Sequence, residues 1–214
     1  MKHKIEKNTV QETLILPLYS RKLCTELYPN LYQDETAVRL IDEIDYDFSE
    51  AEKNSRSLMQ RFGALEVAMR QNDLAWEVRD YLKTHPSAAV FFASGVFYYF
   101  LTQQVKALVR GMADAFPGGV LVFDAANRTA VKMIAKTWLR TAKIKDVGAY
   151  FAVSDAPKEI GEWDNRLQVT SRGYMLGYND LRDTSVSGFF RFLARVGDNG
   201  MKMQIVKIRF GGKA

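Results

Sequence analysis

The sequence predicts an α/β fold, in which strands alternate with helices and build a sheet that is covered on both faces. Residues 89–131 are typical of a strand, a polar turn, a helix, a Gly-Gly turn, a second strand and a second helix, in that order. Residues 89–93 and 120–123 are short, wholly apolar runs, as expected of parallel strands buried on both faces. Because residues 1–86 carry only helical patterns, we expect an N-terminal helical lid (residues 1–86) followed by a sheet-containing part (residues 87–214).

Three helices are expected in the lid. Leucines recur near helical spacing over residues 12–27, where Pro17 favours a break or a late start. Asp34 precedes an amphipathic segment and suits its N-cap, with acidic side chains following in the first turn. The longest helical pattern covers residues 57–82 and is stopped by His85-Pro86.

The part of the chain after residue 124 is expected to add two helices and further strands. Residues 129–142 and 189–196 have helical patterns, residues 149–153 read as a short strand or extended segment, and residues 167–178 as a strand or loop. Residues 201–210, MKMQIVKIRF, alternate most clearly. We expect them to form a late antiparallel strand inserted into a mostly parallel sheet.

Composition excludes several classes of protein. The 214 residues are 47% hydrophobic and 26% charged, as in ordinary globular domains, and no apolar run approaches the ~20 residues of a membrane helix. We therefore expect a cytoplasmic protein with no membrane partner. One cysteine (Cys24) and two histidines exclude a disulfide framework and argue against a Cys/His zinc site, so no metal is expected.

The net charge of +5 is unevenly distributed. Residues 1–100 carry 12 Lys and Arg against 15 Asp and Glu, whereas residues 101–214 carry 18 against 10. A basic half can favour anionic ligands or nucleic acid. Its cations are dispersed among apolar positions, which is typical of solvated faces, so we expect a small-molecule substrate and no nucleic-acid partner.

The carboxyl ends of the two apolar runs mark the edge at which α/β sheets bind ligands. Ser94 and Asp124 lie there. A nucleotide-like ligand is normally held by a Gly-rich turn after the first strand. Only Gly63 of the 14 glycines precedes residue 95, so the sequence lacks that turn.

Six blocks of sequence carry a resemblance to a known family. In chain order they are ETLILPLYSRKL, IDEIDYDFS, YLKTHP, ASGVFYYF, FPGGVLVFDA and MQIVKIRFGG. Together they resemble the leucine carboxyl methyltransferase family, which includes polyketide O-methyltransferases, and they span nearly the whole chain. The resemblance implies a Rossmann-like class I methyltransferase sheet, S-adenosylmethionine as cofactor, and methyl transfer to an oxygen of a small molecule or to a carboxylate oxygen.

The chain departs from this family at one place. In family members, the strand after YLKTHP continues into the Gly-rich turn and further strand-helix units. In this chain Val90 is followed directly by Phe91, so about 70 residues of the family pattern are absent. The expected fold is thus a truncated Rossmann-like sheet with a helical lid. Two hypotheses stay open: an O-methyltransferase, or a catalytically inactive remnant that serves as a binding or interaction protein, with homodimer formation through an exposed strand edge.

The resemblance also implies cofactor-binding residues, although it assigns no catalytic one. Arg70 is expected to grip the cofactor carboxylate, and Arg21 is a weaker candidate for that role. The alternative for Arg70 is a helix-surface pair with Asp73. Ser94, where many family members have a glutamate, and Tyr99 are expected to line the cofactor, with simple packing as the alternative for Tyr99.

Two further residues are expected near the methyl acceptor. Asp124 is a candidate for facing the substrate, and the alternative is that it caps the next helix together with Asn127 and Thr129. Tyr174 is a candidate for the acceptor pocket. Tyr98 and Phe100, in the ASGVFYYF block, are expected in the core.

Overall fold

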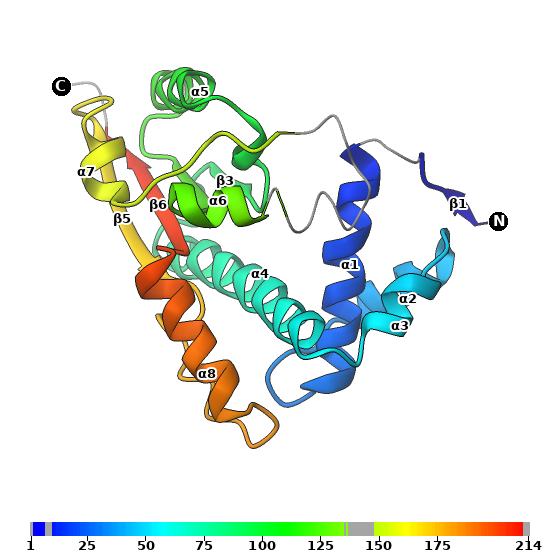
Figure 1. Ribbon diagram of the computed structural model, residues 1–214. Coiled ribbons are helices and arrows are strands. Elements are labelled where there is room, and N and C mark those ends of the chain that lie inside the picture. The colour runs from blue at the N-terminus through cyan, green and yellow to red at the C-terminus, as the bar shows by residue number, and fades with distance from the viewer. Residues whose placement is uncertain (1, 7–9, 135, 137–147, 212–214) are drawn as a thin grey trace.

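The computed structural model describes residues 2–6, 10–134, 136 and 148–211, and these form a mixed α/β fold around a four-stranded sheet. The strands lie in the order β3 (Val90–Ala93), β4 (Val120–Ala125), β6 (Gln204–Phe210) and β5 (Leu167–Gly173) (Figure 1). β3 is parallel to β4, and β6 is antiparallel to both β4 and β5. The prediction of a late antiparallel strand among strands of one direction is therefore confirmed.

Strand β3 contains the Val90–Phe91 junction, at which the sequence predicts a missing segment. Val90 pairs with Val120 and Phe91 with Leu121, and the parallel register continues to Ala93. The junction is thus regular strand. It lies at the edge of the sheet, because β3 has β4 as its one neighbour among the described strands.

Side-chain alternation gives the sheet two differently covered faces. On one face, Val120 and Val122 belong to a core cluster shared with helices α1 (Val10–Leu27), α4 (Leu58–Thr84) and α8 (Gly188–Arg195). On the other face, Leu121 and Phe123 pack with α5 (Thr102–Ala115) and α7 (Ala156–Gly161). Helix α4 lies along the sheet and α1 packs beside it, so residues of the expected lid share one core with the strands (Figure 1).

The helices of the lid begin and end largely where the sequence predicts. Asp34 caps α2 (Glu35–Glu43), and Ser57 caps α4 by accepting a hydrogen bond from the Gln60 amide. Helix α3 (Ser49–Asn54) lies between them, and the short strands β1 (His3–Lys4) and β2 (Ile44–Asp45) pair in parallel.

The prediction of a break or late start at Pro17 is wrong. Helix α1 runs from Val10 to Leu27 with Pro17 inside it. An internal proline costs roughly 3 kcal/mol. Burial of Tyr19 and Leu23 in the core cluster that includes α4 offsets that cost.

The later elements follow the predicted order, and β5 and β6 are shorter than the segments expected for them. Helix α6 (Arg128–Ile134) covers the start of the helix expected over residues 129–142, and most of the remainder lies outside the described residues. Residues 149–153 form no strand, the strand within residues 167–178 is β5, and α8 matches the short helix. The 3-10 turn η1 (Phe97–Tyr99) precedes α5, and the π-helical turn η3 (Val196–Gly200) follows α8.

Within the described part of the chain, no helix combines the length and the apolar character needed to cross a bilayer.

Candidate functional site

A group of polar side chains gathers at the edge of the sheet where β3, β4 and β5 end. Its members, called here the Arg70 cluster, are Glu66, Arg70, Tyr98, Asp124 and Tyr174. They come from α4, η1, the end of β4 and the residue after β5. The parallel direction of these three strands explains why residues 98, 124 and 174, far apart in the chain, meet at one edge.

The centre of the cluster is a buried ion pair. Arg70 Nη1 donates to Asp124 Oδ2 at 3.2 Å, and the Gly95 amide donates to Asp124 Oδ1 at 2.6 Å. The Asp124 side chain is 1% exposed and that of Arg70 is 15% exposed. Burial is the largest single influence and lowers the pKa of Arg70, but the Asp124 carboxylate together with Tyr174, Tyr98 and Glu66 outweighs it. The pKa of Arg70 is therefore raised, and the guanidinium stays charged.

These contacts decide between alternatives that the sequence leaves open. Arg70 pairs with Asp124 and not with Asp73. Asp124 does not cap α6, because Asn127 Oδ1 accepts the Ala130 amide hydrogen at 3.0 Å and fills that role. The capping interpretation of Asp124 is therefore wrong, and its carboxylate joins β4 to α4 and to the turn after β3.

Glu66 and two tyrosines complete the cluster. Tyr174 donates its hydroxyl hydrogen to Glu66 Oε1 at 3.1 Å. Burial, more than any neighbour, raises the pKa of Glu66, and burial together with nearby carboxylates raises the pKa values of Tyr98 and Tyr174. Both phenols therefore stay protonated and act as hydrogen-bond donors in this cluster.

One donor of the cluster is free. Arg70 Nε is buried and has no hydrogen-bond partner among the described residues. A guanidinium has five N–H donors in a fork that fits a carboxylate, and Asp124 engages one end of it. An unpaired buried donor is costly, so this N–H is suited to a further oxygen acceptor.

Ser94 and Tyr99, the other two residues expected to line the cofactor here, are sequence neighbours of Gly95 and Tyr98. Ser94 follows β3 and is partly buried, and Gly95 after it adopts a φ of +68°, which glycine accommodates and which directs its amide to Asp124. Tyr99 is partly buried in η1, whereas its neighbour Tyr98 is the one that joins the cluster. Tyr98 is buried as predicted, at 5% exposure, whereas the same prediction is wrong for Phe100, which is 43% exposed after η1.

Sequence reasoning missed Glu66 and the polar role of Tyr98. Glu66 lies four residues before Arg70 on α4, which places both on the same helix face. That spacing is a signal that could have found Glu66. The contact between Tyr98 and Asp124 depends on the pairing of β3 with β4 and has no local signal.

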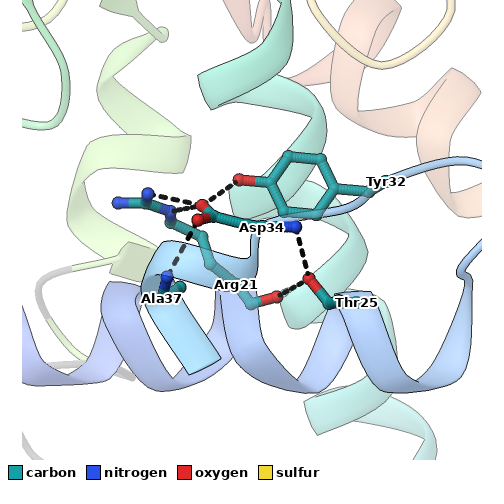
Figure 2. Close-up of polar contacts among 5 residues, drawn as sticks. All are labelled: Arg21, Thr25, Tyr32, Asp34 and Ala37. Carbon is teal, nitrogen blue, oxygen red and sulfur yellow. Dashed lines mark hydrogen bonds and ion pairs between the residues drawn. The ribbon is translucent and has the colours of Figure 1, made fainter. Parts of the chain in front are cut away.

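Arg21 belongs to a separate structural group (Figure 2). Its guanidinium binds Asp34 Oδ2 through Nε at 2.8 Å and Nη2 at 2.5 Å, and Tyr32 donates to the same oxygen at 2.9 Å. Asp34 Oδ1 accepts the Ala37 amide hydrogen, and Thr25 Oγ1 accepts that of Asp34. Arg21 thus ties α1 to the start of α2, and none of its described contacts reaches the Arg70 cluster.

A second polar group lies between α4 and the strands β5 and β6. Glu77 accepts the Tyr178 hydroxyl hydrogen at 2.7 Å and pairs with Lys207 Nζ at 2.5 Å. Asp73, one turn earlier, is 1% exposed, and neither of its carboxyl oxygens has a partner among the described residues. Burial first, and then the nearby Asp198 carboxylate, raise the pKa of Asp73 to about 8, so this side chain is mainly neutral at pH 7.

Comparison with protein-family models, with curated protein sequences and with solved structures found no match. Among the described residues, no group of three or more His, Cys, Asp or Glu side chains is arranged to hold a metal ion.

Proposed function

We propose that this chain is an S-adenosylmethionine-dependent O-methyltransferase with a truncated Rossmann-like class I sheet. In this proposal Arg70 holds the carboxylate of the methionine part of the cofactor. The observation that carries it is the free, buried Arg70 Nε at the carboxyl edge of parallel strands, the edge at which α/β sheets bind ligands. The six sequence blocks that resemble the family support the same assignment.

The residues present fit one end of this cofactor. A carboxylate matches the free donor of Arg70, and Gly95 brings no side chain to the space beside the guanidinium. The adenosyl end has no matching turn, because only Gly63 precedes residue 95 among the glycines. We therefore expect weak binding dominated by the methionine part.

The cofactor supplies an electrophilic methyl group on a sulfonium, so the reaction asks the protein mainly for positioning and exclusion of water. Asp124 orients the Arg70 guanidinium, and the Gly95 amide fixes Asp124 in turn. Tyr174 and Glu66 hold each other and close the cluster beside α4. The proposed acceptor is a hydroxyl or carboxylate oxygen of a small molecule.

A transfer assay tests this function. The protein is incubated with methyl-labelled S-adenosylmethionine and a panel of small phenols and carboxylic acids, and label in the extracted products is counted. The proposal expects label in at least one oxygen acceptor. It expects none with the variant Arg70→Gln/Asp124→Asn, which removes the pair without leaving a lone buried charge. Equal label from both proteins contradicts the proposal.

A catalytically inactive interaction protein is the second candidate, and a different observation favours it. The outer edge of β3 has no neighbouring strand among the described residues, and Phe92 on it is 44% exposed. An apolar open edge favours pairing with a second copy. Light scattering then gives a dimer for the wild-type chain and a monomer for Phe92→Lys, and a wild-type monomer at all concentrations excludes this candidate.

A further inference from the structure

The described part of the chain contains a cavity at the opposite edge of the sheet from the Arg70 cluster. Its volume is about 380 Å³. It lies between the last turns of α4, the start of β5 and the second half of β6, and side chains with hydrogen-bond donors dominate its lining. These are Thr84, His85, Gln168, Thr170, Lys207 and Arg209.

Strand register explains why four of these side chains face the cavity together. Gln168 is paired with Arg209, and Thr170 with Lys207, across β5 and β6. Each strand contributes positions i and i+2, which point to the same face. Directly opposed residues have Cβ atoms about 5 Å apart, so the four side chains form a compact square of donors.

Arg209 is the cation with the most freedom to bind a ligand. Lys207 is neutralised by Glu77, whereas none of the ion pairs found among the described residues includes Arg209. The Arg209 guanidinium lies over the Tyr81 ring, 5.4 Å from its centroid, and its Nη2 is 3.4 Å from His85 Nε2. These contacts orient the guanidinium and leave most of its N–H groups free.

The wall behind Arg209 is held in place. The rings of Tyr81 and His85 are stacked, with centroids 4.3 Å apart and an interplanar angle of 2°. Tyr81 donates its hydroxyl hydrogen to the Gly118 carbonyl at 2.9 Å, and His85 Nδ1 lies 2.8 Å from Thr84 Oγ1. The donors at this end of the cavity therefore have fixed positions before a ligand arrives.

We propose that this cavity binds the phosphate group of a small molecule. Donors reach it from α4, β5 and β6, which matches the several oxygens of a tetrahedral oxyanion better than the two coplanar oxygens of a carboxylate. Its volume exceeds that of a lone phosphate and lies in the range of small-molecule sites. Asp80 on its wall, which pairs with Lys83 at 3.5 Å, and the negative C-terminal end of α4 weaken the attraction, so millimolar affinity is expected.

Nuclear magnetic resonance titration tests the site. Amide shifts of the ¹⁵N-labelled full chain are followed with inorganic phosphate and, in a separate arm, with glycerol 3-phosphate, at constant ionic strength. We expect saturable shifts centred on residues 84–85, 168–170 and 207–209. The arm with the tighter binding distinguishes free phosphate from a phosphate monoester as the source.

Two variants and a matched control decide the outcome. Arg209→Gln is expected to weaken binding at least about tenfold, because a charge-assisted hydrogen bond is lost, and Thr170→Val to weaken it less. Both positions are exposed, so the fold is expected to persist. Arg39→Gln removes the same charge from an exposed position on α2 and is expected to leave binding unchanged. Shifts that do not saturate, or equal losses in Arg209→Gln and Arg39→Gln, overturn the proposal.

Discussion

Arg21 and Arg70 are both paired with an aspartate, yet the two sites differ in what they leave available. Asp34 engages two nitrogens of Arg21 while it caps α2, and the group ties two helices together. Asp124 engages one nitrogen of Arg70, and Nε of that arginine remains buried and free. The comparison shows that a guanidinium is a candidate for ligand binding where its structural partner leaves part of the fork unused.

The largest expected effect comes from breaking the buried pair. Asp124→Ala leaves the Arg70 charge and the Gly95 amide without a partner, and we expect a loss of about 3 to 5 kcal/mol in the free energy of unfolding. Urea denaturation followed by circular dichroism measures it. Asp124→Asn retains an acceptor for the Gly95 amide and is expected to lose less. If Asp124→Ala loses less free energy of unfolding than Asp34→Ala, the expected order of the two sites is wrong.

The next largest effect is expected at Asp73, a buried carboxyl outside both arginine sites. Its substitution is expected to increase the free energy of unfolding, whereas that of Asp124 decreases it. The pKa of Asp73 is raised from 3.8 to about 8, so the folded state keeps a proton that the unfolded state has released. The Asp73 contribution to stability therefore declines as pH rises from about 4 to about 8 and stays low above that range.

Asp73→Asn removes this decline. We expect the variant to be more stable than the wild-type chain at pH 8 by on the order of 1 to 3 kcal/mol, with a much smaller difference at pH 4. Thermal melts at pH 4, 6 and 8 test this. A stability difference that does not change with pH contradicts the assignment of a neutral Asp73.

Substitution of Asp34, the N-cap of α2, is expected to lower the free energy of unfolding by a smaller amount. Asp34→Ala removes the N-cap of α2 and the partner of Arg21, and we expect about 1 to 2 kcal/mol of destabilisation. Asp34→Asn keeps an equally good cap and loses only the charge, so most of the stability is expected to return. Urea denaturation of both variants separates the cap from the ion pair, and equal losses in the two contradict a capping role.

Arg21→Gln is expected to have the smallest effect. The Arg21 side chain is 28% exposed, and partly exposed ion pairs contribute roughly 0 to 1 kcal/mol. Melting curves at low and high salt check this, because screening weakens such a pair. A loss as large as that of Asp124→Ala contradicts the contrast drawn between the two arginines.

Features encoded locally could be predicted from the sequence. Apolar runs located β3 and β4, the cap at Asp34 located the start of α2, and the helical spacing of apolar residues located α4. Pro17 misled because its local cost is offset by packing between helices that are far apart in the sequence. Short sequence patterns predict the secondary-structure propensity of a segment, but they do not predict how deeply the segment is buried in the folded protein.

The candidate site was predictable only in part, for the same reason. Arg70 and Asp124 were found singly, from family resemblance and from position at a strand end. That they bind each other depends on how α4 crosses β4, which no local pattern records. The burial of Asp73, on a helix with polar residues on several sides, had no sequence signal either.

The most direct test of the account is calorimetric titration with S-adenosylmethionine of the wild-type chain, Arg70→Gln/Asp124→Asn and Arg21→Gln, after circular dichroism shows that all three are folded. We expect saturable binding to the wild-type chain and to Arg21→Gln, and none to the double variant. Binding to all three proteins, or to none of them, contradicts the claim that Arg70 receives the cofactor carboxylate.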